Sequence, residues 1–373
     1  MKEKIWLSSP HMGGNEFNYI KEAYDTNWIA PLGPNVNGLE HDIENYTNCG
    51  YAAALSSGTS AIHLALILSG VNQDDEVLCS SFTFSATANP IVYQKATPVF
   101  VDSEEDTWNI CPELLKRAIE DRISKGKKPK VLILVHLYGM PAKMDEIISI
   151  CKTYEITLIE DAAEGLGSTY KGKALGTFGR FGILSFNGNK IITTSGGGAL
   201  MSSDEKLIQK ARFLATQARD EAPHYQHSEI GYNYRMSNIC AGIGRGQFEV
   251  LDDRVKKKRE IYDFYRKKLY DIKNIRFLEE QEGMFSNRWL TTIIIEEENI
   301  SRETIRLALE KDNIESRPLW KPMHLQPVFE QYPAYINGTS ERLFEKGLCL
   351  PSDSKMNEKD LNRVVKIIKN LIS

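Results

Sequence analysis

The sequence lacks the motifs that define several classes of protein. Its six cysteines are scattered without a CxxC pair, and its seven histidines form no HExxH pattern, so neither a disulfide framework nor a metal site is expected. No apolar run is long enough to span a bilayer, and the N-terminus lacks the apolar segment of a secretory signal. A net charge of -4 gives no basic footprint for nucleic acid or anionic membranes. We therefore expect a reduced, cytoplasmic protein with no nucleic-acid or membrane partner.

Hydrophobic periodicity predicts two structural units behind a short arm. The chain has 373 residues, of which 42% are hydrophobic and 26% charged, as in an ordinary soluble globular protein. From residue 51 to 161, short apolar runs alternate with helical patterns, which favours an α/β fold with a mixed, mostly parallel sheet flanked by helices. We predict an arm over 1–14, a large domain over 15–250 and a smaller C-terminal α+β domain over 251–373.

The expected elements follow one another closely along the large domain. Strands are predicted at 51–55, 76–80, 98–102, 130–137, 156–161, 182–186 and 198–202, with helices at 59–69, 84–94, 112–124 and 144–154. The segment 217–233 is polar and aromatic and is predicted to be a long loop. Long loops in compact domains are usually functional.

Lys190 lies in an unusually apolar, glycine-rich stretch of the sequence. It follows the apolar run 183–186 and the turn 187–189, and it precedes Ile191, Ile192 and the glycines 196–198. Burial disfavours the charged form of lysine, which is how lysine becomes a nucleophilic amine near neutral pH. Taken alone, the pattern is explained better by a surface lysine in a β-turn.

Two other stretches carry groups that complement an amine. At Gly58-Thr59-Ser60 a strand gives way to a helix, whose free N–H groups and hydroxyls can bind an anion, although a simple N-cap also explains the turn. Asp161 ends an apolar strand, where ligands bind in open α/β sheets, although it could equally cap the next turn. Together with Lys190 these groups predict a pyridoxal 5'-phosphate site, because that cofactor needs phosphate donors, an acidic partner for its ring nitrogen and an amine for its aldehyde.

A series of short motifs extends this interpretation through nearly the whole chain. The motifs are Trp28-Ile29, Ser57–Ser60, Thr83–Thr87, Pro98–Asp102, His136–Gly139, Glu160–Ala163, Ser185-Phe186 with Lys190 and Gly196–Gly198, and Gly231–Ser237. In this order they resemble the DegT/StrS family of nucleotide-sugar aminotransferases, which are fold type I pyridoxal phosphate enzymes like aspartate aminotransferase. The stretches at 27–30 and 317–326 most resemble the branch that makes UDP-4-amino-4,6-dideoxy-N-acetylglucosamine.

The resemblance implies a role for each matched residue. Lys190 would form the Schiff base and move the proton, and Asp161 would pair the pyridine nitrogen. Phe84 would stack on the ring, and Asn233 would reach the phosphate from the other subunit of a homodimer with shared active sites. The implied cofactor-binding residues are Gly58, Thr59, Ser60, Phe84, Asp161, Glu164, Ser185, Lys190 and Asn233. The implied substrate-binding residues are Asn27, Trp28, Ile29, Ala30, Arg317, Trp320, Lys321 and His324.

Some of these residues have simpler interpretations. Phe84 can be a core residue, and Trp320 and His324 can pack where the two domains meet. Glu164 departs from the resemblance, because many members of the family carry glutamine or histidine near the phenolic oxygen of the ring. A carboxylate there would repel that oxygen unless it were protonated or turned aside.

The implied activity is a transamination. L-Glutamate would donate its amino group, and C4 of a UDP-linked 4-keto-6-deoxy-N-acetylhexosamine would accept it, giving a sugar for surface polysaccharide or glycan synthesis. The nearest alternative is the same chemistry on a GDP- or dTDP-linked 4-keto or 3-keto sugar. Lys190 argues against a dehydratase of the family, in which histidine replaces that lysine, and the complete site argues against a non-catalytic pyridoxal phosphate-binding regulator.

Overall fold

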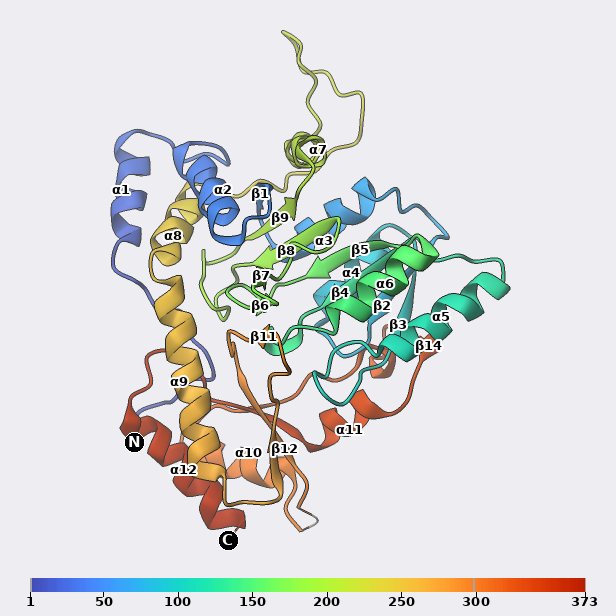
Figure 1. The fold of residues 1–373 in the computed structure, drawn as a ribbon. Helices are drawn as coiled ribbons and strands as arrows, with labels where there is room; N and C mark the ends of the chain where they lie inside the picture. The colour runs from blue at the N-terminus through green and yellow to red at the C-terminus, as the bar shows by residue number, and fades with distance from the viewer. Residues whose placement is uncertain (1, 298, 373) are drawn as a thin grey trace.

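A mixed, eight-stranded sheet forms the centre of the computed structural model, which describes residues 2–297 and 299–372 (Figure 1). The strand order is β1-β9-β8-β5-β4-β2-β3-β14. Neighbours from β8 to β14 pair in parallel, whereas β9 is antiparallel to both β1 and β8. The strands are β1 (Tyr51–Leu55), β9 (Gly198–Ser202), β8 (Phe181–Ser185), β5 (Thr157–Asp161), β4 (Val131–Val135), β2 (Glu76–Ser80), β3 (Thr97–Val101) and β14 (Ala334–Tyr335). The sheet confirms the predicted α/β class.

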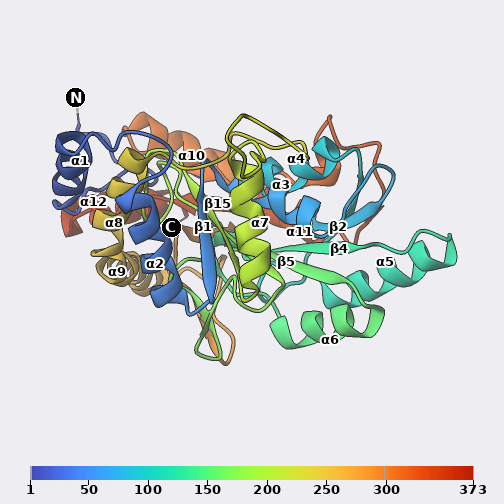
Figure 2. The same ribbon diagram turned by 90° about the horizontal axis from the view of Figure 1, so that it is seen from above.

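Helices cover both faces of this sheet, as the view from above shows (Figure 2). Apolar side chains of α3 (Gly58–Leu68), α4 (Ser85–Tyr93) and α7 (Glu205–Ala215) form the core on one face. Those of α2 (Pro34–Thr47), α5 (Pro112–Ser124), α6 (Met144–Tyr154) and α8 (Asn238–Phe248) form it on the other, with α1 (Glu16–Asp25) packed on α8. Because both faces are covered, central strands such as β4 are apolar and buried at every position.

A second core lies around the long helix α9 (Leu251–Leu269). Here an antiparallel sheet has the order β10-β12-β15-β13. Its strands are β10 (Ile275–Phe277), β12 (Thr291–Ile295), β15 (Gly347–Leu350) and β13 (Arg317–Pro318), and the helices beside it are α10 (Arg302–Lys311), α11 (Thr339–Lys346) and α12 (Glu358–Ile372). Ile5, from the predicted arm, is buried in this core and pairs with Ile314. The N-terminal segment is therefore packed against the C-terminal part of the chain.

Two strands of the C-terminal region pair with strands of the large unit, β14 in the eight-stranded sheet and β11 in a separate three-stranded sheet. β14 pairs with β3, and β11 (Met284–Phe285) pairs with β6 (Thr169–Tyr170), which also pairs with β7 (Lys173–Ala174). The described residues also form two 3-10 turns, η1 (Leu137–Gly139) and η2 (Met323–Leu325). The domain boundary at residue 250 stays a prediction.

Membrane-spanning helices, metal-ligand clusters and disulfides are the features that were not expected from the sequence. No helix there is long and apolar enough to cross a membrane. The same residues contain no group of three or more histidine, cysteine, aspartate or glutamate side chains placed to hold a metal ion. All six cysteines are free, and five are buried.

The start of α3 and the start of β9 approach each other very closely. Gly198 pairs with Leu55 at the end of β1. A Cβ atom added to Gly198 would lie 2.4 Å from the backbone nitrogen of Gly58 and 2.5 Å from the carbonyl carbon of Ser57. Glycine is thus required at residue 198 for the backbone contact that seats the first turn of α3.

This contact generates a test of stability. We expect Gly198→Ala to lower the free energy of unfolding by about 1–3 kcal/mol, because the added methyl group forces two backbone segments apart. Gly196→Ala is the matched control, since a Cβ there meets nothing within 4 Å. Denaturant unfolding of the apoprotein measures both variants, and equal stability of the two would contradict the close approach.

Candidate active site

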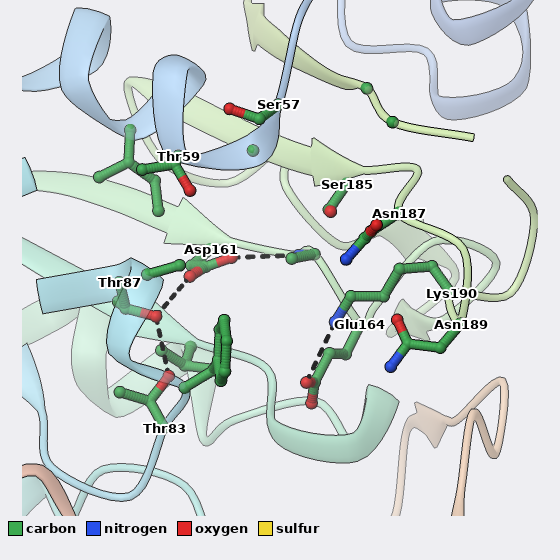
Figure 3. Close-up of a pocket in the computed structure, with 18 of the residues that line it drawn as sticks. Ser57, Thr59, Thr83, Thr87, Asp161, Glu164, Ser185, Asn187, Asn189 and Lys190 are labelled. Atoms are coloured by element: carbon green, nitrogen blue, oxygen red, sulfur yellow. Dashed lines mark hydrogen bonds and ion pairs between the residues drawn. The ribbon is translucent and has the colours of Figure 1, made fainter. Parts of the chain in front are cut away.

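A cavity of about 300 Å³ lies where parallel strands of the large sheet end (Figure 3). Its walls come from the first turns of α3 and α4, the ends of β4, β5 and β8, and the loops after β5 and β8. The lining residues are Ser56, Ser57, Gly58, Thr59, Ile62, Thr83, Phe84, Ala86, Thr87, Val135, Asp161, Ala163, Glu164, Ser185, Asn187, Asn189, Lys190, Gly196, Gly197, Trp289 and Trp320. Residues distant in sequence are thus collected at one edge of the sheet, where open α/β sheets bind ligands.

The N-terminus of α3 provides donors for an anion. Ser57 is the N-cap, and its Oγ accepts a hydrogen bond of 3.0 Å from the backbone nitrogen of Ser60. Gly58 and Thr59 then present the first helical turn to the cavity, and Ser185 faces them from the end of β8. A helix N-terminus with hydroxyl groups favours phosphate. The Ser60 side chain bonds Ser56 and Ser57 instead and does not line the cavity.

Asp161 is a buried carboxylate at the end of β5. Its Oδ2 accepts a hydrogen bond of 2.7 Å from Thr87 Oγ1, which also bonds Thr83 Oγ1 at 2.8 Å (Figure 3). Its Oδ1 accepts one of 3.2 Å from the backbone nitrogen of Ala163, so Asp161 also caps the following turn. Burial raises the pKa of Asp161, while Thr87, Ala163 and the charge of Lys190 oppose the rise. The carboxylate is therefore oriented from two sides.

Lys190 points into the cavity and contacts a second carboxylate. Its Nζ lies 3.3 Å from Glu164 Oε1 and 4.2 Å from the centroid of the Trp289 ring. The other oxygen of Glu164 accepts a hydrogen bond of 2.7 Å from the backbone nitrogen of Tyr138. Burial raises the pKa of Glu164, and the charge of Lys190 opposes it. Glu164 is thus turned toward an amine and a backbone donor. Turning aside in this way is one of the two conditions under which its carboxylate would not repel the phenolic oxygen of the cofactor.

Two aromatic side chains border the cavity near the start of α4. Phe84 is 53% exposed, so it is not a core residue. Its ring lies 5.4 Å from that of Trp320, which is stacked on Tyr138 at 6.3 Å. The indole nitrogen of Trp320 is buried and has no hydrogen-bond partner. Trp320 therefore packs between the two parts of the chain and also lines the cavity.

Other predicted site residues lie away from this cavity. Arg317 is exposed, pairs with Glu315 and lines an adjoining cavity of about 380 Å³ that shares Asn189, Trp289 and Trp320 with the first. Lys321 is exposed and outside both linings. The two ring nitrogens of His324 bond Ser81 and Glu341, and the ring is buried, which matches its packing interpretation.

The early loop and Asn233 also lie outside the cavity of their own chain. Asn238, at the start of α8, holds the carbonyl groups of Trp28 and Ala30 at 2.9 Å each. The side chains of Trp28 and Ile29 are 43% and 55% exposed. Asn233 is exposed beside Thr216, and Asn27 has a positive φ of 59° in the same loop as Trp28. None of these residues lines the cavity of its own chain.

Among the cavity residues that received no role from the sequence, Thr87, Trp289 and Asn189 make the most informative contacts. Thr87 and Trp289 contact Asp161 and Lys190 directly, and Asn189 carries a carbonyl that accepts from the Trp289 indole at 2.8 Å. Thr87 stands four residues after Thr83, which lies just before α4, and this spacing at a helix start could have indicated that the two hydroxyls meet. Trp289 comes from a distant region, so only tertiary structure reveals it.

Comparisons with known proteins agree with this geometry. A profile of the DegT/DnrJ/EryC1/StrS aminotransferase family matches residues 10–369. The chain belongs to this family. It is 55% identical to EpsN of Bacillus subtilis (strain 168), a candidate pyridoxal phosphate-dependent aminotransferase, over 100% of the chain and 96% of that protein.

Two further relatives widen the comparison. GDP-perosamine synthase of Escherichia coli O157:H7 is 36% identical over 99% of each chain. The crystal structure of a DegT DnrJ EryC1 StrS aminotransferase from Brucella abortus superposes with a TM-score of 0.90 at 28% identity, covering 96% of this chain and 95% of that one. The chain is therefore a sugar aminotransferase of fold type I, and its cofactor is pyridoxal 5'-phosphate.

The cavity fits this cofactor by the chemistry of its groups. The hydroxyls and N–H groups at the start of α3 suit a phosphate, and the buried Asp161 suits a protonated ring nitrogen. Lys190 offers an amine to an aldehyde, and the exposed ring of Phe84 offers an aromatic face. A Cβ on Gly58 would come within 3.2 Å of Ser185 Cβ, so glycine keeps this cradle open.

The raised pKa of Glu164 predicts a pH dependence of stability. In the apoprotein the folded state holds the proton of Glu164 more tightly than the unfolded state, so this group's contribution falls as pH rises from about 4.5 through its raised pKa. We expect Glu164→Gln, which does not titrate, to gain stability relative to the wild type over this interval. Thermal unfolding of both apoproteins across pH 4–8 checks this. If the stability of Glu164→Gln relative to the wild type instead fell with rising pH, burial would not be the dominant influence on the pKa of Glu164.

Proposed function

We propose that this protein transfers the amino group of L-glutamate to the C4 ketone of a nucleotide-linked 4-keto-6-deoxy sugar. The observation that carries the proposal is the meeting of Lys190, Asp161 and the α3 N-terminus in one cavity. Membership of a sugar aminotransferase family supports the reaction class. The product would serve surface polysaccharide or glycan synthesis.

The roles proposed for the main cavity residues agree with their surroundings. Bound pyridoxal 5'-phosphate supplies the aldehyde and the electron-accepting ring. The side chain of Lys190 is only 13% exposed, and its Nζ would bind the aldehyde carbon and then carry a proton to and from the reacting carbon. Asp161, oriented by Thr87 and Ala163, holds the proton on the ring nitrogen. Phe84, whose ring contacts Trp320, would cover one face of the cofactor ring.

The nucleotide is the finer part of the proposal. The stretches at 27–30 and 317–326 support a UDP-linked N-acetylhexosamine. The relatives named GDP-perosamine synthase support the alternative, a GDP-linked keto sugar. The adjoining cavity, with Arg317 at its edge and an unpartnered indole nitrogen in its wall, offers a cation and a donor for either substrate.

A homodimer with shared active sites completes the proposal. Lys190 and Asp161 line the cavity of their own chain, whereas Asn233 and the loop at 27–30 are not among its lining residues. The exposed Trp28 and Ile29 would be covered in a dimer. We propose that these segments enter the site of the partner subunit, and that the enzyme works in the cytoplasm, where nucleotide sugars are made.

A panel of substrates tests the reaction and the nucleotide together. The purified enzyme is incubated with L-glutamate and with UDP-, GDP- or dTDP-linked 4-keto-6-deoxy sugars, and the aminated product is identified by mass spectrometry. We expect the UDP-linked N-acetyl sugar to exceed the others by about 10-fold or more in kcat/KM. Lys190→Ala is the control and should be inactive. Transfer to the GDP-linked sugar alone would favour the alternative, and transfer to none would refute the proposed reaction.

Mixing two inactive variants tests the shared site. Lys190→Ala removes the amine, and Asn233→Ala removes the proposed contact from the partner. After subunit exchange, a heterodimer carries both residues intact in one of its two sites, so we expect up to about half of the wild-type activity per heterodimer. Activity assays of the mixture, with exchange verified by differently tagged chains, measure the rescue. Absence of rescue would mean that each site is built from one chain.

A further inference from the structure

A buried lysine without an anionic partner lies behind the wall of the active site. Lys258, in the middle of α9, is 2% exposed. No carboxylate of the described residues forms an ion pair with it, and burial lowers its pKa to about 7, opposed by the more distant charge of Asp353. A buried charge of this kind costs stability. This cost favours a role for Lys258 beyond filling space in the core.

Three oxygen atoms surround the amine of Lys258. Its Nζ donates to the carbonyl of Trp289 at 2.9 Å, the carbonyl of Ser352 at 2.8 Å and the hydroxyl of Ser8 at 3.2 Å. An ammonium group has three N–H donors, so three acceptors satisfy it fully. These acceptors belong to the N-terminal segment, the turn before β12 and the segment after β15. One amine therefore joins three distant stretches of chain.

Two of these three residues converge on the carbonyl just before Lys190. The indole nitrogen of Trp289 donates to the carbonyl oxygen of Asn189 at 2.8 Å. The hydroxyl of Ser8, which accepts from Lys258, donates to the same oxygen at 3.1 Å. The Trp289 ring also lies under Lys190 Nζ at 4.2 Å. The Asn189–Lys190 peptide is thus fixed from outside its own loop.

We propose that Lys258 is a positioning residue for Lys190. It holds Ser8 and Trp289, and these two hold the Asn189 carbonyl so that the following side chain points into the cavity. The inference rests on the proposed role of Lys190 as the cofactor-binding amine. A loop secured only by its own hydrogen bonds, such as that from Lys190 N to Asn187 O, would leave the amine free to swing.

Hydrogen exchange and cofactor affinity test this proposal on the full-length protein. Lys258→Met removes all three donors, and Ser8→Ala removes one link from a half-buried position where folding is not at risk. In both variants we expect faster exchange of the backbone amides at 187–194. We also expect the Kd for pyridoxal 5'-phosphate to rise, by about 10-fold for Lys258→Met and less for Ser8→Ala. The double variant should bind no more weakly than Lys258→Met, because both act through one oxygen.

Two variants of α9 separate positioning from general stability. Lys256→Met removes a lysine from the exposed side of the helix, and Leu269→Ala lowers thermal stability from the core at its far end. Neither should change exchange at 187–194 or cofactor affinity. If Lys258→Met does not fold, Ser8→Ala decides alone.

The outcomes also separate this proposal from the proposed function. Unchanged exchange at 187–194, or faster exchange with unchanged affinity, overturns the positioning role. An effect of Leu269→Ala equal to that of Lys258→Met overturns it as well. None of these measurements involves a keto sugar, so an enzyme that accepts no sugar would refute the proposed reaction and leave this result standing.

Discussion

The site depends on keeping an amine and two carboxylates together out of water. Lys190, Glu164 and Asp161 are all largely buried, and each would be costly to bury alone. The protein meets this cost by giving each carboxylate fixed donors: Tyr138 N and Lys190 for Glu164, and Thr87 and Ala163 N for Asp161. Because these donors sit on different strands and helices, the large sheet has to bring all of them to one edge.

The N-terminal and C-terminal segments belong to this arrangement. Ser8 and Trp289 both reach the carbonyl of Asn189, and β14 and β11 join sheets of the large unit. Trp320 stacks on Tyr138, whose backbone nitrogen holds Glu164. A movement of the C-terminal region would therefore change the positions of Lys190 and Glu164. This coupling gives a physical reason for the cavity to lie between the two parts of the chain.

Local pattern was enough for much of the fold. The strands expected at 51–55 and 76–80 agree with β1 and β2, because each is a short apolar run bounded by turn residues. The alternation of strand and helix indicated a parallel sheet, and the mixed edge at β9 and β1 agrees with the expected class. β12 begins at Thr291, and Trp289, two residues before it, lines the cavity.

The sequence by itself determined the residue types of the site and their place at strand ends and helix starts, because those places follow from periodicity and turn chemistry. It supported Lys190, Asp161 and Thr59 in this way, and all three line the cavity. Only the tertiary structure decided that Glu164 turns toward Lys190, that His324 packs between Ser81 and Glu341, and that Lys258 and Trp289 lie behind the lysine. These contacts join residues tens to hundreds of positions apart, and such distances are set by how sheets and helices pack, not by any local pattern.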